Sequence, residues 1–357
     1  MTNRRVNEID LLRFIAAIAV VFFHLSFRGY AADGMSTMPY PRMADFAKYG
    51  YFGVELFFMI SGFVILMTAV NGNLRGFLIS RIVRLYPAFW ACCSITYLLI
   101  IAIGAPRFSA SLGQYLINMT MMSGFLGVPP IDGVYWSLFV EMRFYALVMI
   151  VLALGKISYC QPFLVLWLVA SVVLEIVPVG KLRYLLIVDY SAYFIAGATC
   201  YLVWSRGVSL YRMGILAASY CLALFHAIGE IPGFEKYYHV DMSTMVVTAV
   251  VTVFFAVMLL VSLGQTSIFG RRRWQVVGTL TYPLYLLHQN IGYMVFNTAY
   301  PNLDIDFLFW TTCIAMILLA HSVHVVVERR YAETFQRILA RAFDTSGSYL
   351  ARLWSKG

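Results

Sequence analysis

The sequence predicts an all-α membrane protein, a bundle of about ten membrane-spanning helices. Of its 357 residues, 61% are hydrophobic and only 12% are charged. The mean hydropathy is +0.79, a value that excludes an ordinary soluble domain. The apolar residues also fall into separate runs, each long enough to cross roughly 30 Å of hydrocarbon.

Ten such runs follow one another along the chain, and each is expected to form one spanning helix. The first is too long for a signal-peptide core and has no small-residue cleavage site, so we expect it to be retained. The expected spans are 9–27, 49–70, 85–104, 136–154, 160–178, 185–204, 211–228, 243–263, 278–298 and 307–327.

The distribution of lysine and arginine predicts the orientation of the bundle. If the N-terminus is cytoplasmic, 17 of the 26 lie in inner segments and 7 in outer loops, while Arg13 and Arg143 lie inside spans. This bias predicts a multi-pass protein of the cytoplasmic (inner) membrane with both termini inside. It also accounts for the net charge of +9 without a nucleic-acid partner.

The two longer outer loops, 28–48 and 105–135, are the candidate substrate mouth. The second contains SASLGQYLINMTMMSG, which favours a short interfacial helix. After Arg330 the chain alternates apolar residues and arginines, a pattern typical of an amphipathic helix on the inner leaflet. We therefore divide the chain into a transmembrane unit, residues 1–330, and a cytoplasmic tail, residues 331–357.

Cysteine and histidine spacing gives no indication of a metal. The six cysteines lie within or beside apolar runs and lack metal-ligand spacing, so we expect free, buried thiols. His321 and His324 stand three residues apart with no third ligand in sequence, and hydrogen bonding near Glu328 is the favoured interpretation.

The first span carries the most informative pair of residues, Arg13 and His24. They are eleven residues apart, which is three helical turns plus about 20° and roughly 16 Å of rise. A charge in mid-membrane costs at least ~2.5–3.5 kcal/mol, so such residues normally face a bundle interior or a hydrated path. In the alternative, Arg13 reaches the headgroups and His24 lies at the opposite interface.

Further polar residues lie in the second and third spans. Glu55 is about two turns deep and requires a partner such as Arg13 or His24. Ser61 and its glycine neighbour permit close helix approach, and a simple packing seam is the alternative. Arg81 and Arg84 share one face at the cytoplasmic start of the third span, where they can bind phosphates or merely follow the positive-inside rule.

The fourth and ninth spans add two more polar clusters. Ser137, Glu141 and Tyr145 share a helix face, and Arg143 lies on another. Tyr285, His288 and Gln289 lie near mid-membrane in the ninth. So many ionisable groups indicate a site or pathway, although pairing across the bundle is an alternative. A transporter or flippase, an intramembrane enzyme, and a structural membrane protein all remain open at this point.

The order of these motifs resembles the acyltransferase-3 family of integral membrane acyltransferases, which modify surface polysaccharides, lipopolysaccharide O-antigens and related glycans. The resemblance covers roughly residues 5–328. Its five motifs are arginine-x10-histidine (Arg13, His24), FFxxSGF (Phe57, Phe58, Ser61, Gly62, Phe63), RxxR with YP (Arg81, Arg84, Tyr86, Pro87), WSLxxE (Trp136, Ser137, Leu138, Glu141) and LYLxH (Leu284, Tyr285, Leu286, His288). Met142 and Arg143 depart from the family's usual Glu-Gln.

The resemblance implies O-acyl transfer, most simply of acetyl, from cytoplasmic acyl-CoA to a glycan or glycolipid outside. Acyl-CoA would be a co-substrate, and no tightly bound cofactor or metal is implied. His24 would be the general base, oriented by Glu55 or Glu141, with Arg13 polarising the thioester. Arg81 and Arg84 would bind the donor's phosphates. The other residues expected to line the site are Ser61, Trp136, Ser137, Tyr285 and His288. The oligomeric state is left open.

Overall fold

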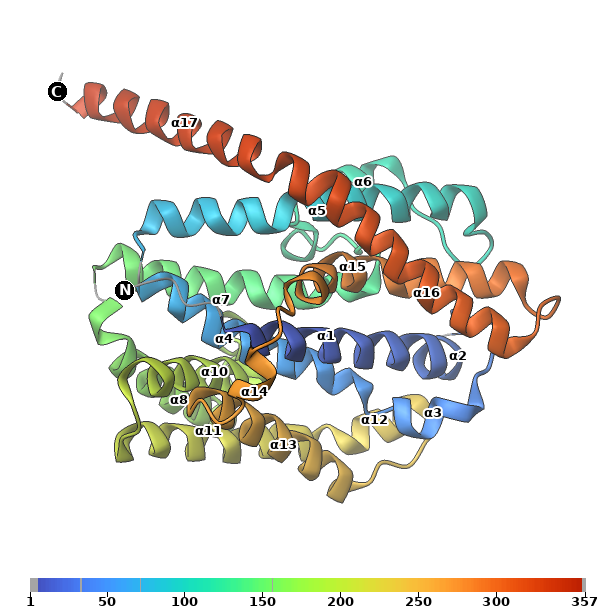
Figure 1. Cartoon of the computed structure of the whole chain (residues 1–357), viewed down its shortest axis with the longest axis horizontal. Coiled ribbons are helices and arrows are strands. Elements are labelled where there is room, and N and C mark those ends of the chain that lie inside the picture. Colours follow the sequence, from blue (N-terminus) through green and yellow to red (C-terminus); the bar gives the residue numbers. More distant parts are fainter. Residues whose placement is uncertain (1–5, 33, 71, 156, 355–357) are drawn as a thin grey trace.

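The computed structural model describes residues 6–32, 34–70, 72–155 and 157–354, and within these ranges every regular element is a helix. Ten long helices run side by side (Figure 1). They are α1 (Asn7–Phe22), α4 (Gly53–Val70), α5 (Leu74–Ile103), α7 (Trp136–Ala153), α8 (Cys160–Ile176), α10 (Val188–Arg206), α11 (Leu210–Gly229), α13 (Thr244–Ser262), α15 (Gln275–Ala299) and α16 (Ile305–Val323).

The predicted all-α membrane bundle is confirmed, and all ten predicted spans coincide with long helices. Nine helical stretches in the described residues are long and apolar enough to cross a membrane. The tenth, α15, has 25 residues but carries threonine, histidine, glutamine and asparagine in its middle. This polar content lowers its hydropathy, and the same residues make α15 central to the site described below.

Short helices connect the long ones. They are α2 (Gly29–Ala31), α3 (Pro41–Ala47), α6 (Leu112–Asn118), α9 (Gly180–Leu185), α12 (Ile231–Tyr238) and α14 (Ser267–Gly270). The short helix predicted in the second outer loop is α6. The Ser111 hydroxyl caps it by accepting a hydrogen bond from the backbone N–H of Gln114 (3.1 Å), which satisfies one free donor of the first turn.

Two long helices extend beyond their predicted limits. α5 begins eleven residues before the predicted span, because Asn73 caps it through the backbone N–H of Gly76 (2.7 Å) and nothing that follows breaks the helix. α16 continues through a π-helical turn, His324–Glu328, into α17 (Arg329–Trp354). The expected domain boundary at residue 330 therefore lies inside a continuous helix, and the membrane-surface role of the tail stays a prediction.

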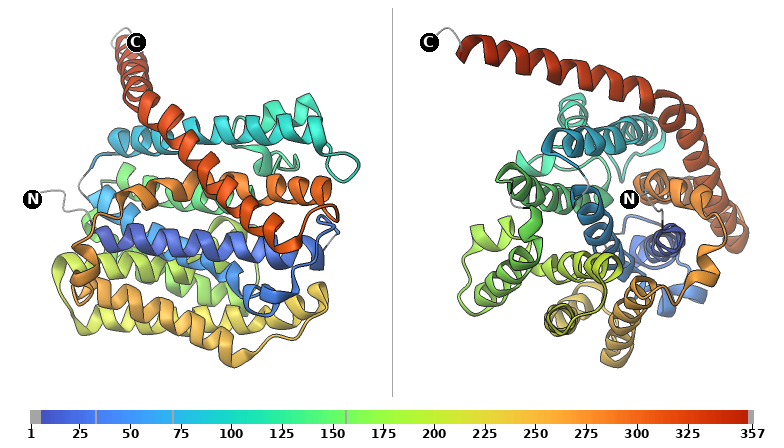
Figure 2. Two further views of the ribbon diagram at one scale, coloured as in Figure 1. Left: turned by 45° about the vertical axis from the view of Figure 1, so that its right-hand side comes forward. Right: turned by 60° about the vertical axis from the view of Figure 1, so that its left-hand side comes forward.

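α4 and α10 pack closely in the interior of the bundle (Figure 2). Glycines make this approach possible. A Cβ on Gly197 would lie 1.7 Å from the Met59 carbonyl oxygen, and one on Gly62 would lie 2.2 Å from the Phe194 carbonyl oxygen. The packing interpretation of the Ser61–Gly62 pair is therefore correct for Gly62, because backbone meets backbone there.

The Gly197→Ala variant tests this seam. The added methyl overlaps a backbone carbonyl that cannot rotate away, so we expect a loss of at least roughly 1–3 kcal/mol of stability. The measurement is the thermal unfolding midpoint of detergent-purified protein, with Gly214→Ala as control, because open space surrounds Gly214. Equal midpoints for the two variants would contradict the account of the seam.

Candidate active site

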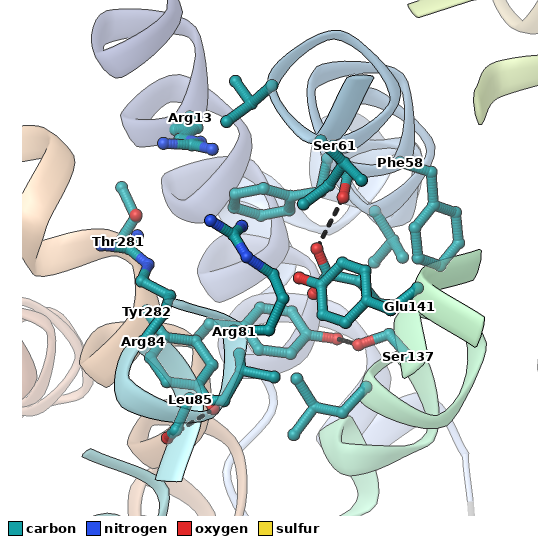
Figure 3. A pocket seen from close by; sticks show the side chains of 17 residues that line it. Arg13, Phe58, Ser61, Arg81, Arg84, Leu85, Ser137, Glu141, Thr281 and Tyr282 are labelled. Carbon is teal, nitrogen blue, oxygen red and sulfur yellow. Dashed lines mark hydrogen bonds between the residues drawn. The ribbon is translucent and has the colours of Figure 1, made fainter. Parts of the chain in front are cut away.

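Five helices (α1, α4, α5, α7 and α15) enclose a cavity of about 100 Å³, here called the central cavity (Figure 3). α4 contributes Val54, Phe57, Phe58 and Ser61, whose spacing of three and four residues places them on one helix face. The other lining residues are Arg13, Val64, Ile65, Arg81, Arg84, Leu85, Ser137, Leu138, Glu141, Tyr145, Thr281, Tyr282 and Tyr285.

The central cavity is positively charged. Among its described lining residues are three arginines, Arg13, Arg81 and Arg84, but only one carboxylate, Glu141. That carboxylate accepts a hydrogen bond from the Ser61 hydroxyl (2.6 Å). A pocket with this excess of guanidinium groups favours an anionic or strongly polarised ligand.

A pair of hydroxyl groups lies where α7 and α15 meet along the cavity wall. The hydroxyl oxygens of Ser137 and Tyr285 are 2.7 Å apart, and Tyr285 also donates to the Val134 carbonyl oxygen (3.1 Å). The ring of Tyr285 lies 5.8 Å from that of His288, centroid to centroid. Tyr285 therefore connects the central cavity to the histidines beyond it.

His24 and His288 form a buried hydrogen-bonded pair that the sequence did not join. His288 Nε2 lies 3.1 Å from His24 Nδ1. His288 Nδ1 lies 3.1 Å and 2.9 Å from the carbonyl oxygens of Leu284 and Tyr285. Because a carbonyl only accepts hydrogen bonds, His288 carries its proton on Nδ1 and presents a lone pair on Nε2.

The protonation of His24 follows from the same contacts. Its Nδ1 faces both the lone pair of His288 Nε2 and the Val20 carbonyl oxygen, 2.9 Å away. Two acceptors require the proton of neutral His24 on Nδ1, which leaves Nε2 with a free lone pair. The arrangement thus produces a potential base at His24 Nε2.

Arg13 and His24 lie at different depths in the bundle. The chain between them is regular α-helix as far as Phe22, so they are about three turns, roughly 16 Å, apart along the axis. His24 lies at the start of a π-helical turn, Phe23–Arg28, a feature that often occurs at functional sites. In the structure Arg13 lines the central cavity, whereas His24 is not among the described residues that line this cavity or the two introduced next.

Three cavities follow one another along α15. A proximal cavity of about 890 Å³, near the start of the helix, includes Gln275 and Thr279. The central cavity includes Thr281 and Tyr285, and a distal cavity of about 320 Å³ includes Gln289. The histidine pair lies between the central and distal cavities, so none of these three cavities is lined by both Arg13 and His24.

The proximal cavity shares Arg81 and Arg84 with the central one, and Arg273 and Arg329 extend its positive lining. His321 and His324 also line it. The predicted hydrogen bonding near Glu328 is confirmed, because His324 Nδ1 lies 2.7 Å from Glu328 Oε2. The part of the chain that is described contains no group of three or more potential metal ligands.

The structure does not bring Glu55 to Arg13 or His24. On α4 it lies one residue, about 100°, from the cavity-lining Val54 and therefore faces a different neighbour. The charged group that acts on Glu55 is Glu230, at the end of α11. The Oε2 atom of Glu55 has no hydrogen-bond partner among the described residues. The expected partnership of Glu55 with the basic residues of α1 is therefore wrong.

Two other expectations, for Trp136 and for the burial of all six cysteines, need correction, and the structure also gives a position to Arg143, whose role the sequence left open. Trp136 packs against Phe58 and Tyr190 (6.3 Å and 5.5 Å between ring centroids) instead of lining the central cavity, because it precedes Ser137 by about 100° on α7. Arg143 lies over the Tyr184 ring, 3.9 Å from its centroid, which makes it a packing residue. The cysteines are free, as predicted, but Cys221 is exposed on the outer surface of α11.

The sequence also gave little indication of Asp132, which is fully buried beside the distal cavity. Its carboxylate accepts hydrogen bonds from the backbone N–H groups of Val134 (3.2 Å) and Asn290 (3.0 Å). Burial nevertheless raises the pKa of Asp132 to about 7. A DG pair in a Pro-rich loop indicates a turn, and nothing local indicates that it anchors α15.

Comparison with known proteins identifies the class to which this site belongs. The family model for an acyltransferase domain matches residues 6–326, so the chain belongs to this acyltransferase family, as the motif resemblance implied. No solved structure matches the chain. Family membership favours the enzyme alternative over the transporter.

Three curated relatives share about a quarter of their aligned residues with this chain. Nodulation protein 10 of Rhizobium leguminosarum bv. viciae is 28% identical over 159 residues, 39% of this chain and 42% of the relative. A putative peptidoglycan O-acetyltransferase of Bacillus subtilis is 25% identical over 172 residues, which are 43% of this chain and 24% of the relative. An O-acetyl transferase of Shigella phage Sf6 is 28% identical over 177 residues, which are 46% of this chain and 50% of the relative. The chain thus spans half or less of the length of these relatives.

Proposed function

We propose that this protein transfers an acetyl group from acetyl-CoA to a hydroxyl of a glycan or glycolipid on the opposite side of the membrane. The observation that carries the proposal is the unprotonated Nε2 of His24, held between an arginine-lined cavity and a second polar cavity. The family match and two relatives named as O-acetyltransferases support the reaction class.

The donor would bind from the cytoplasmic side. The positive-inside distribution of lysine and arginine supports a cytoplasmic position for the end of the bundle at which α1 begins. Arg273 and Arg329, with the shared Arg81 and Arg84, give the proximal cavity the guanidinium groups that bind phosphates. The thioester arm would then pass Arg81 and Arg84 into the central cavity.

The size of the central cavity favours a short acyl group. The cavity measures only about 100 Å³, and Phe57, Phe58 and Tyr285 take up much of its lining. We therefore propose acetyl, the smallest of the common acyl groups, as the group that is transferred.

In the proposed reaction His24 Nε2 takes the proton from the acceptor hydroxyl while that oxygen attacks the thioester carbonyl carbon. The new C–O bond forms, the C–S bond breaks, and the proton passes from His24 to the departing CoA sulfur. General base catalysis of this kind contributes ~10²–10⁴-fold in rate. His288 acts as a positioning residue, because it fixes the tautomer of His24.

Two other residues receive roles that follow from their positions. Arg13 precedes His24 by three turns, roughly 16 Å of rise. We therefore assign Arg13 to binding of the donor and not to polarisation of the thioester carbonyl, which reacts beside His24. The Ser137–Tyr285 hydroxyl pair lies nearer the histidines and is the better candidate to polarise the thioester carbonyl.

His24→Ala is the first test. We expect at least a hundredfold loss of acetyl transfer, because the base is absent, while acetyl-CoA binding persists, because the arginines remain. The measurement is transfer of labelled acetyl from acetyl-CoA to glycan, with donor binding by equilibrium dialysis. His226→Ala is the matched control, since His226 bonds to Glu175 (2.9 Å) away from the three cavities. Normal transfer by His24→Ala would refute the assignment.

The second test is the double variant Arg81→Ala, Arg84→Ala. Removal of two phosphate-binding groups should weaken acetyl-CoA binding about tenfold or more, since each charged hydrogen bond contributes roughly 1.5–3 kcal/mol. The KM for the acceptor glycan should change little. Arg212→Ala serves as control, because Arg212 lies outside the lining of all three cavities. An equal rise in both KM values would show that the arginine pair is structural.

A further inference from the structure

We infer that the distal cavity is the binding site for one sugar residue of the acceptor, and that Gln289 is a hydrogen-bonding group that holds it. The inference rests on the proposed function and deepens it, since it names the acceptor site within this chain. The cavity opens at the end of the bundle opposite the arginine-lined proximal cavity. Its lining includes Arg28, Arg107, Gln114, Gln289, Asn290 and Tyr293.

The lining and the volume fit a sugar. The side-chain amides of Gln114, Gln289 and Asn290 make hydrogen bonds within the protein. The donor and acceptor positions that these bonds leave unused can bind vicinal hydroxyl groups. Tyr293, Pro129 and Pro130 also line the cavity and supply apolar surface. The volume of about 320 Å³ lies at the lower end of the range for small-molecule sites, which suits a single sugar residue.

Gln289 provides the specific indication that a ligand belongs here. Its side chain is only 6% exposed, and its Nε2 donates to the Asn290 Oδ1 at 3.3 Å. Its buried Oε1 has no hydrogen-bond partner within the described structure. Such an unsatisfied acceptor is costly in a folded protein. We propose that the amide turns toward the cavity, where a ligand hydroxyl donates to this oxygen.

The neighbours of Gln289 hold this polar wall in a fixed position. The backbone N–H of Asn290 donates to Asp132, and its side-chain amide donates to the Ile131 carbonyl oxygen (3.0 Å). A Cβ on Gly133 would lie 2.5 Å from Gln289 Nε2, so the loop backbone lies directly against the amide. The site is therefore arranged before the ligand arrives, which reduces the cost of binding.

The position of the cavity suits the proposed chemistry. Gln289 directly follows His288 on α15, and Arg28 lies four residues after His24 in the π-helical turn Phe23–Arg28. A sugar held by Gln289 would therefore lie next to the histidine pair. Only the side chains between the distal cavity and the histidine pair would then separate one of its hydroxyl groups from His24 Nε2.

Saturation-transfer NMR on detergent-purified protein tests sugar binding without catalysis. The probes are methyl glycosides of N-acetylglucosamine, galactose and rhamnose, each measured separately. We expect a signal for at least one probe, and at least a tenfold weaker Kd for Gln289→Leu. Gln265→Leu, which removes an exposed glutamine, should bind as the parent does. No signal for any probe with the parent would overturn the inference.

Two further measurements separate the inference from the proposed function. Gly133→Ala displaces the Gln289 amide without replacing it, and it should weaken sugar binding in the same direction. In the acetyl-transfer assay, Gln289→Leu should raise the acceptor KM at least tenfold and leave acetyl-CoA binding unchanged. Transfer with an unchanged acceptor KM would overturn the inference alone. A parent protein that transfers no acetyl group would overturn both.

Discussion

The functional account depends on one interaction, the hydrogen bond between His24 and His288 in the interior of the bundle. The carbonyl oxygens of Leu284 and Tyr285 hold the proton of His288 on Nδ1. His288 Nε2 and the Val20 carbonyl oxygen then hold the proton of His24 on its own Nδ1. Backbone groups of two helices thereby leave the Nε2 of His24 unprotonated. No carboxylate is needed for this result, which distinguishes the arrangement from a base oriented by aspartate or glutamate.

The polar composition of α15 follows from the same design. A helix that lines three successive cavities cannot be as apolar as its neighbours. The middle of α15 is therefore less hydrophobic, because it carries polar side chains that line these cavities. α4, which lines the central cavity, packs tightly against α10 through the glycine seam, and this contact holds that part of the cavity wall in place. The proximal and distal cavities, at opposite ends of this row, are suited to different ligands: phosphates beside Arg273 and Arg329, and hydroxyls beside Gln289.

Sequence patterns predicted the fold well, because hydrophobic run length is a direct consequence of membrane thickness. They also placed Arg13, Ser61, Arg81, Arg84, Ser137, Glu141 and Tyr285 in what became one cavity. They failed where depth, side-chain direction or a distant contact decides the outcome. Arg13 and His24 do not line one common cavity among the described residues. Glu55 lies one residue, about 100°, from the cavity face of α4 and has Glu230 as its charged neighbour. Asp132 accepts a hydrogen bond from Asn290, which is 158 positions away in the sequence.

Nitrogen chemical shifts test the central claim most directly. In protein labelled with ¹⁵N at its six histidines, two-bond correlation spectra distinguish the two neutral tautomers and the imidazolium. The His24 signals are assigned by their loss in His24→Ala. The account predicts that His24 at neutral pH is protonated on Nδ1 and unprotonated on Nε2, and that His288→Phe disturbs this state. A His24 protonated on Nε2, alone or as imidazolium, would contradict the proposed base.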